Sequence, residues 1–282
     1  MNMYKKQYCD TDSIKVFSHT SKRELENVIE EETQTNSETN TTTILNHFWG
    51  PNKTILNMME NYCVTNKCEK ILEIGPGKVP FKLATDFIGS NETIKSYIEI
   101  DIDKQVFPYP DTHFDFIYCR HVVEDIQNPD FALSEMLRIS KRGYIETPSP
   151  LIEITKDVDA APLSEKYCGY IHHRYIVWSN IQKNEIYFLP KYSCILDHML
   201  DINDDVKRDL YNLINNYPVY WNNYFTYNIG DNLENRPNVI MYKNGVNFGV
   251  NKHMLEDYIA LISRAINESI ENTNYFVSIM RK

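Results

Sequence analysis

Short apolar runs bounded by turn residues recur between residues 71 and 148, and each predicts a strand. The predicted strands cover residues 71–74, residues 96–101, part of 107–125, and residues 143–148. Apolar residues at helical spacing follow Asn128-Pro129 and stop at Lys141-Arg142-Gly143, which is typical of a helix with its start and stop signals. This region therefore carries at least one helix among its strands.

Apolar spacing also predicts elements on both sides of this region. Residues 44–59 and 253–270 have the periodicity of amphipathic helices. A hairpin is expected over residues 239–250, because Asn-Gly tolerates the positive φ of a type I′ turn. We expect a last strand at Tyr275–Ile279, and we expect the polar tract at residues 30–43 to bury too little apolar surface to order itself.

The turn after the first predicted strand is the most informative stretch of the chain. Glu73 lies near the end of the apolar run, and Gly75-Pro76-Gly77 follows it. Glycine lets the backbone approach a ligand closely, and amides at a helix start point at the ligand, so we expect a nucleotide-type site here. The dinucleotide-binding version of this turn needs a third glycine where this chain has Pro80, which disfavours a nicotinamide cofactor.

The second predicted strand also ends in a carboxylate. Asp101 lies close to where a nucleotide-binding βαβ unit places the acid that binds the ribose hydroxyls. Glu99 and Asp103 compete for this role, and we favour Asp101 for its place at the strand end.

Together these motifs resemble the class I S-adenosylmethionine (SAM) methyltransferases. The turn at 73–77 is similar to their first motif, and residues 107–125 are similar to their "fPD-x-x-FD" and "H-V-x-E" stretches. The resemblance covers residues 69–150. It implies an α/β fold with a Rossmann-like, mostly parallel sheet and helices on both faces. It also implies SAM as the cofactor, with Glu73 holding the amino group of its methionine part.

The resemblance further implies a set of cofactor-binding positions, which are Glu73, Gly75, Pro76, Gly77, Asp101, Ile102, Cys119 and Arg120. The chain departs from the family between Asp101 and Phe114, where there are too few residues for the usual helix and third strand. We therefore expect a sheet abbreviated around strand 3. No acid that would receive the adenine amino group is evident, so we expect backbone and apolar residues such as Val106 and Phe107 to hold adenine.

An aromatic-rich run beyond residue 150 supplies candidates for the acceptor site. It includes His172 and His173 and should lie near the carboxyl edge of the sheet, where α/β folds bind ligands. A histidine suits the role of base when the acceptor is a hydroxyl, and on a strand two adjacent histidines point to opposite faces. The catalytic candidates are His172, His173 and His121, and the acceptor-binding candidates are Arg120, Tyr170, Arg174 and Glu146.

A metal ion is not expected, because Asp157, Asp159 and a histidine have the spacing of no defined metal signature. The leading hypothesis is a SAM-dependent methyltransferase that acts on a small polar acceptor, with a sugar or glycan precursor as the best guess. RNA or cap methylation is one alternative. A non-catalytic, methyltransferase-like binding module is another.

Composition limits the binding partners and the cellular compartment that we expect. The chain has 282 residues and a net charge of −10, which repels nucleic acid, and its polar N-terminus lacks a signal-peptide core. Six scattered cysteines without a Cys-x-x-Cys pair favour a reducing cytoplasm, and the abundance of Asn, Ile, Lys and Tyr is typical of an AT-rich, viral genome. We expect a small-molecule or sugar acceptor as the partner, no membrane and no nucleic acid, and the sequence does not decide between a monomer and a homodimer.

Three regions are expected along the chain. Residues 1–43 form a polar N-terminal segment, residues 44–150 form the SAM-binding core, and residues 151–282 form an acceptor-binding insertion that also completes the sheet with an additional α+β region.

Overall fold

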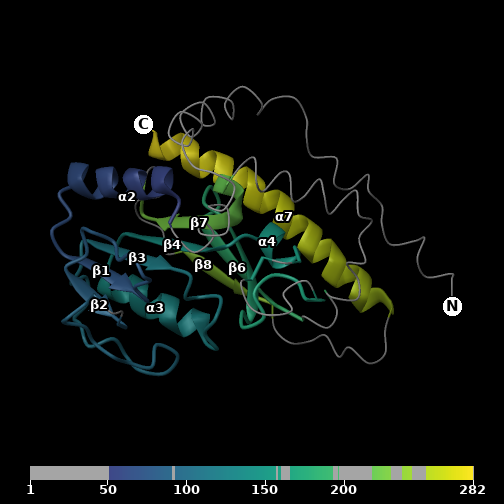
Figure 1. Ribbon diagram of the computed structural model, residues 1–282, viewed down its shortest axis with the longest axis horizontal. Helices are drawn as coiled ribbons and strands as arrows, with labels where there is room; N and C mark the ends of the chain where they lie inside the picture. Colours follow the sequence, from purple (N-terminus) through teal and green to yellow (C-terminus); the bar gives the residue numbers. More distant parts are fainter. Residues whose placement is uncertain are drawn as a thin grey trace.

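The structure is a computed structural model that describes residues 51–90, 93–156, 158–159, 166–192, 196, 218–229, 237–242 and 252–281. The polar segment at residues 1–43, the first part of the helix expected from residue 44, the Asn-Gly turn at 244–245, and Asp157 lie outside these residues. The described part contains a five-stranded sheet and a three-stranded sheet (Figure 1).

The five-stranded sheet has the order β2-β1-β3-β4-β7. Its first four strands are parallel, and β7 is antiparallel to β4. Three of the strands predicted from the sequence are confirmed at their expected places, and the C-terminal region adds a strand to the sheet as expected. The strands are β1 (Ile71–Ile74), β2 (Asp86–Ile88), β3 (Phe116–Arg120), β4 (Gly143–Pro148) and β7 (Asn222–Tyr227).

Helices cover both faces of this sheet. α2 (Lys53–Thr65) and α7 (Lys252–Met280) lie on one face, and α3 (Pro129–Ile139) lies on the other (Figure 1). The ring of Tyr62 on α2 lies 5.9 Å from that of Phe116, and the ring of Phe276 on α7 lies 5.0 Å from that of Tyr224. The expected α/β fold with a mostly parallel sheet is therefore confirmed.

The smaller sheet interleaves with the larger one along the chain, because β7 lies between its second and third strands, and both sheets pack on α7. The smaller sheet consists of β5 (Tyr175–Asn180), β6 (Glu185–Pro190) and β8 (Asn238–Met241), in the order β5-β6-β8. Asn272 on α7 donates to Ser179 on β5 and to the carbonyl oxygen of Tyr224 on β7, at 3.0 and 2.6 Å. This buried side chain therefore ties the helix to both sheets.

Two short helical segments lie next to the larger sheet. The single-turn α4 (Pro150–Glu153) follows β4 directly, and the 3₁₀ helix η4 (Pro218–Trp221) leads into β7. The hydroxyl of Ser149 accepts from the amide of Ile152 and donates to the carbonyl oxygen of Tyr220. One serine therefore caps α4 and fixes it against η4.

The strand expected at Tyr275–Ile279 is wrong, because these residues belong to α7. The run has β-branched and aromatic residues that favour a strand locally. In the fold, however, Phe276 is fully buried against Tyr224 and Tyr144, while Ser278 is exposed. Packing of one helical face on the sheet overrides the local preference, and the helix predicted over 253–270 continues to Met280.

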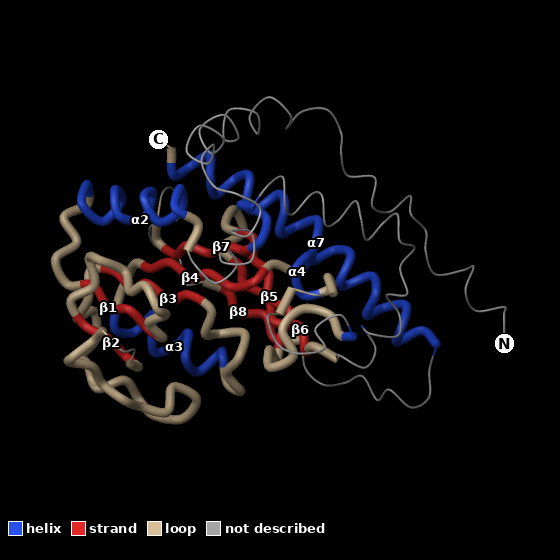
Figure 2. Tube along the Cα trace, viewed as in Figure 1, coloured by secondary structure: helices blue, strands red, loops and turns tan. Residues whose placement is uncertain are grey.

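The sheet is abbreviated after Asp101 as expected, because residues 101–115 form neither a helix nor one of the strands. Residues 96–101 form no strand beside β1, and Ile98 makes only a single parallel bridge to Ile88 of β2. The strand beside β1 is β2, which the sequence reading missed. The connection over residues 75–85 also contains no helix (Figure 2), so the fold is shortened between β1 and β2 as well as after Asp101.

No helix within the described ranges is both long enough and apolar enough to cross a bilayer. None of the cysteines in these ranges, Cys63, Cys68, Cys119 and Cys168, forms a disulfide, which agrees with the reduced thiols expected from their scattered spacing.

Candidate functional site

The two glycines of the turn after β1 have different structural roles. Gly75 has φ +67°, and a Cβ built there would overlap Val122 Cγ2 in the loop after β3. Gly75 therefore permits the left-handed backbone and the close approach of a neighbouring loop. A Cβ at Gly77 would meet no atom within 4 Å, so this glycine borders open space. Pro76 between them is buried.

The amides of a helix start, expected after this turn, are not present, since residues 78–85 contain no helix. A ligand at this turn would therefore meet turn backbone, without the field of a helix dipole.

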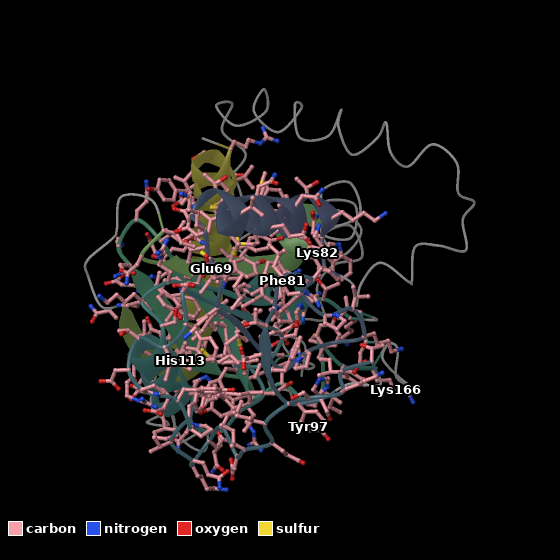
Figure 3. All side chains as sticks on the ribbon, turned by 90° about the vertical axis from the view of Figure 1, so that its left-hand side faces the viewer. Glu69, Phe81, Lys82, Tyr97, His113 and Lys166 are labelled. Atoms are coloured by element: carbon pink, nitrogen blue, oxygen red, sulfur yellow. The ribbon has the colours of Figure 1, made fainter. Side chains whose placement is uncertain are left out.

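Glu73 on β1 is a buried carboxylate beside the turn. Its Oε2 accepts from the amide of Phe81 at 2.9 Å, and burial raises the pKa of Glu73 to about 7 despite this bond and the nearby Arg120. The ring of Phe81 stacks on Tyr118 at 4.4 Å, and the neighbouring Lys82 pairs with Glu60 on α2. Figure 3 shows Phe81 and Lys82 beneath α2. A buried carboxylate with a raised pKa is a group that a cationic ligand would stabilise.

The strand expected before Asp101 is reduced to a single bridge. Because β2 occupies the place beside β1, Asp101 follows the outermost pairing of the sheet, the bridge at Ile98. Its exposed carboxylate accepts from Lys104 Nζ at 2.9 Å, which lowers the pKa of Asp101. The strand predicted at residues 96–101 does not form beyond this bridge, and the ribose role of Asp101 stays a prediction.

The other residues expected to contact the ribose or the adenine differ in how exposed they are. Glu99 is exposed, while Asp103 Oδ1 accepts from the amide of Asn128 at 2.6 Å, just before α3. Ile102 is half-buried against the core. Phe107 is buried in the main core, so its side chain is not available to adenine, whereas Val106 is exposed.

Arg120 and Glu146 form an ion pair at the carboxyl ends of β3 and β4. Arg120 Nε lies 2.9 Å from Glu146 Oε1, which also accepts from Asn222 Nδ2 at 2.6 Å. The hydroxyl of Tyr144 donates to the other oxygen of Glu146. Burial opposes the charge of Glu146, but Arg120 above all lowers its pKa to about 2. The carboxylate is therefore charged and fully partnered.

Cys119 was expected near the cofactor, but its side chain points the other way. It is fully buried in the main core, on the face of the sheet opposite that of Arg120. Only the backbone at this position could serve a ligand.

His121 follows β3 with φ +53°, a conformation that a non-glycine residue rarely adopts. Its Nδ1 lies 3.7 Å from Glu124 Oε1, and its Nε2 lies 3.8 Å from Glu146 Oε1. Both distances exceed a hydrogen bond. Among the described residues, His121 Nε2 and both carboxylate oxygens of Glu124 are buried without a hydrogen-bond partner. Burial lowers the pKa of His121 and raises that of Glu124 well above its usual range.

Glu153 is a further buried carboxylate, and its partners hold together the loops next to Glu146. Glu153 on α4 bonds His173 Nδ1 through Oε1 at 2.6 Å and Lys191 Nζ through Oε2 at 2.5 Å. Lys191 also donates to the carbonyl oxygen of Tyr170 at 2.7 Å. Burial disfavours the charge of Glu153, but Lys191 and His173 together lower its pKa.

His172 and His173 lie in a turn before β5, so the expectation that they point to opposite faces of a strand is wrong. Their rings are 4.5 Å apart, and both face Asp125 after β3. Arg174 is exposed and donates through Nε to the carbonyl oxygen of Asp125 at 2.9 Å. Tyr170 is buried beside His173.

Three acceptor-site candidates from the sequence, His121, Arg120 and Glu146, therefore meet at one end of the sheet. The histidine pair and Arg174 lie on the adjoining turn, which is bonded to Glu124 and Asp125. Asp159, considered earlier as a metal ligand, instead accepts from the hydroxyl of Tyr167 at 3.1 Å.

Sequence reasoning did not assign a role to Glu153, Lys191 or Asn222. Glu153 carried a weak signal, because it follows Ser149-Pro150 in a one-turn helix immediately after a strand. Lys191 and Asn222 carried none, since each is an ordinary polar residue at the border of a strand.

Residues 62–145 match a family model described as "Methyltransferase domain". No curated protein matches the chain. One similar solved structure is the plantazolicin methyltransferase BpumL in complex with a triazolic desmethylPZN analog and SAH, which is 21% identical to this chain. The matched region covers 53% of this chain and 62% of the BpumL chain, with a TM-score of 0.31. A SAM-dependent methyltransferase from Thermotoga maritima, described as a possible histamine N-methyltransferase, is 15% identical, with coverages of 45% and 61% and a TM-score of 0.29.

The chain spans about half to three fifths of the length of these and the other solved structures at the head of the comparison.

The difference between the two glycines gives a stability prediction. Gly75→Ala should lower the free energy of unfolding by more than about 1 kcal/mol, because the new Cβ meets Val122 and the positive φ is strained. Gly77→Ala should change it by less than about 0.5 kcal/mol, because its Cβ enters open space. Urea unfolding of both variants measures this, and equal losses would contradict it.

Proposed function

We propose that this chain transfers a methyl group from SAM to a hydroxyl of a small polar acceptor, and the match of residues 62–145 to a methyltransferase-domain model supports the methyl transfer. A sugar or glycan precursor is the acceptor class that we favour. The acceptor would lie at the carboxyl ends of β3 and β4, where Arg120, His121 and Glu146 meet.

The observation that carries this proposal is the state of His121. A hydroxyl needs a base for methylation, and a base must be neutral at working pH. Burial lowers the pKa of His121, so its imidazole is neutral at pH 7. Its Nε2 is buried with no hydrogen-bond partner in the described ranges, which is the position that an acceptor hydroxyl would fill.

The residues around His121 support that role. Glu124 Oε1 faces Nδ1, so the Nδ1 proton can point toward this oxygen and leave the Nε2 lone pair for the acceptor. The positive φ of His121 aims the ring away from the line of β3, and backbone strain of this kind is often concentrated at functional sites. Arg120 would then orient the acceptor, because its guanidinium can donate to a hydroxyl group, and Glu146 would hold Arg120 in place through their ion pair.

The residues of the first turn fit the cofactor. Gly77 borders open space, and Glu73 is a buried carboxylate that a cationic amino group would stabilise. SAM supplies an electrophilic methyl group on sulfur. Glu73 would bind the amino group of SAM, and the protein backbone from Gly75 to Gly77 would pass close to the cofactor. The protein would also keep water away from the acceptor.

The acceptor class that we favour follows from the net charge of the chain and from the polar side chains that line the proposed acceptor site. A net charge of −10 opposes binding of a polyanion such as RNA, whereas the buried edge of the sheet offers paired donors and acceptors suited to hydroxyl groups. RNA methylation would appear as methyl uptake into RNA that falls steeply with salt. A binding module would take up the cofactor without transferring methyl to any acceptor.

Cofactor binding is tested with S-adenosylhomocysteine (SAH) by isothermal titration calorimetry. We expect saturable binding by the full chain and at least a tenfold weaker Kd for Gly77→Arg, because the new side chain fills the open space over the turn. Gly77→Ala is the matched control and should bind as the wild type does. Equal Kd values for the arginine and alanine variants would reject the turn as the cofactor site.

The affinity for SAH should also depend on pH through Glu73. The folded carboxyl has a pKa of about 7, and a bound ammonium favours its ionised form. Binding therefore releases a proton below pH 7, and Kd should weaken by up to about tenfold per pH unit as the pH falls below 7. Titrations in buffers of different ionisation enthalpy measure this proton, and Glu73→Gln should show no such release. Proton release of the same size in Glu73→Gln would place the titrating group elsewhere.

Methyl transfer should depend on His121 as the base. His121→Asn should reduce kcat by about 10²- to 10⁴-fold while SAH binding is retained. In the wild type, kcat should be flat above about pH 7 and fall below about pH 6.5, because protonation removes the base and the pKa of His121 lies below its ordinary value. Uptake of labelled methyl into a panel of nucleotide sugars and into RNA measures the rate.

The control for this experiment is His113→Asn. His113 precedes β3 at the opposite edge of the sheet and stacks on Tyr109. An unchanged rate in His121→Asn, or the same loss in His113→Asn, would remove His121 from the mechanism.

A further inference from the structure

Three side chains that the proposed methyl transfer does not use converge beside the acceptor site. They are Asp125 in the loop after β3 and the pair His172 and His173 in the turn before β5. Each offers one ligand atom, and the three atoms lie within 4.8 Å of one another. We propose that these residues bind a divalent transition-metal ion.

The distances within the cluster suit an ion better than direct bonds. His173 Nε2 lies 3.7 Å from Asp125 Oδ1, and His172 Nε2 lies 3.9 Å from Asp125 Oδ2. Both distances are too long for a hydrogen bond. Two atoms that each bind one metal ion at about 2.1 Å lie about 3.4 Å apart in tetrahedral geometry. The two histidine–carboxylate distances, each to a different oxygen of Asp125, exceed this separation by only a few tenths of an ångström.

The tautomer of His173 presents a lone pair to the cluster. Its Nδ1 bonds Glu153 Oε1 at 2.6 Å, and Glu153 is held in turn by the buried ammonium of Lys191. A carboxylate behind the imidazole is the usual second partner of a metal-binding histidine, because it places the proton on Nδ1 and leaves Nε2 for the ion. This partner arrangement is already complete in the fold.

Asp125, the third proposed ligand, has a carboxylate oxygen, Oδ1, that is buried without a hydrogen-bond partner among the described residues. Arg174 donates to the backbone oxygen of Asp125 and not to its carboxylate. A buried carboxylate oxygen without a partner costs free energy, and an ion between it and the two imidazoles would remove that cost.

Backbone bonds hold the two loops together without any ion. The amides of Arg174 and Tyr175 donate to the carbonyl oxygen of Glu124 at 2.9 and 3.2 Å, which fixes the histidine turn next to Asp125. The site is therefore built in advance, and ordering it on binding costs little conformational entropy.

The ligand types indicate the class of ion. Two imidazoles and one carboxylate suit zinc, iron(II), cobalt or nickel better than magnesium or calcium, which prefer oxygen ligands alone. Three protein ligands leave coordination positions open for water or an acceptor oxygen. The three residues match no local metal motif, because α3, β4 and α4 separate Asp125 from the histidines along the chain.

Binding is tested on the full chain after treatment with a chelator, with Co²⁺ as the probe. We expect one equivalent to bind with the visible absorption of an imidazole and carboxylate site, and His172→Ala and Asp125→Asn to weaken Kd at least tenfold. His172 is exposed, so its variant should keep the fold, which circular dichroism verifies. His113→Ala, which removes a histidine outside the cluster, should bind as the wild type does.

Three results would each overturn the site. They are the absence of stoichiometric Co²⁺ uptake, a near-ultraviolet thiolate band that assigns the ion to cysteines, and equal Kd values for His172→Ala and His113→Ala. None of these readouts depends on methyl transfer, so the metal site and the proposed function can fail separately.

Discussion

Two buried carboxylates at the carboxyl edge of the main sheet constrain everything around them. Glu146 and Glu153 are each about 1% exposed, and an unpaired charge at such a position costs several kcal/mol. The fold compensates Glu146 with Arg120, Asn222 and Tyr144, and it compensates Glu153 with Lys191 and His173. These partners come from strands β3, β4 and β7 and from two loops, so satisfying the charges also fixes the relative positions of those segments.

Glu124 and Asp125 contrast with these two carboxylates, because neither has its full set of partners in the described part of the chain. Both lie in the loop after β3, beside the compensated pair. Burial keeps the pKa of Glu124 well above its usual range, and the oxygen Asp125 Oδ1 faces His173 across a gap too long for a hydrogen bond. A rigid, satisfied frame next to unsatisfied polar atoms is the arrangement that ligand binding requires. The acceptor site and the metal site proposed here both draw on it.

Local signals in the sequence predicted much of the core correctly. The apolar run before Gly75, the helix after Asn128-Pro129 and the strand ended by Pro148 all formed as expected, because each depends on neighbouring residues alone. The wrong secondary-structure predictions are those for segments whose conformation depends on contacts with distant parts of the chain. Residues 96–101 have strand character, but β2 takes the place beside β1, and Tyr275–Ile279 became helical because Phe276 packs on Tyr224.

By itself the sequence determined the α/β class, the glycine turn beside Glu73 and the presence of His121 after a buried strand, since these follow from short-range patterns of polarity and turn residues. The tertiary structure decided which of the polar residues meet. Glu153 and Lys191 are 38 residues apart, and Glu146 and Asn222 are 76 apart, and nothing in their local patterns links them. Their pairing follows from the cost of burying charge, which is set only when the strands and loops have come together.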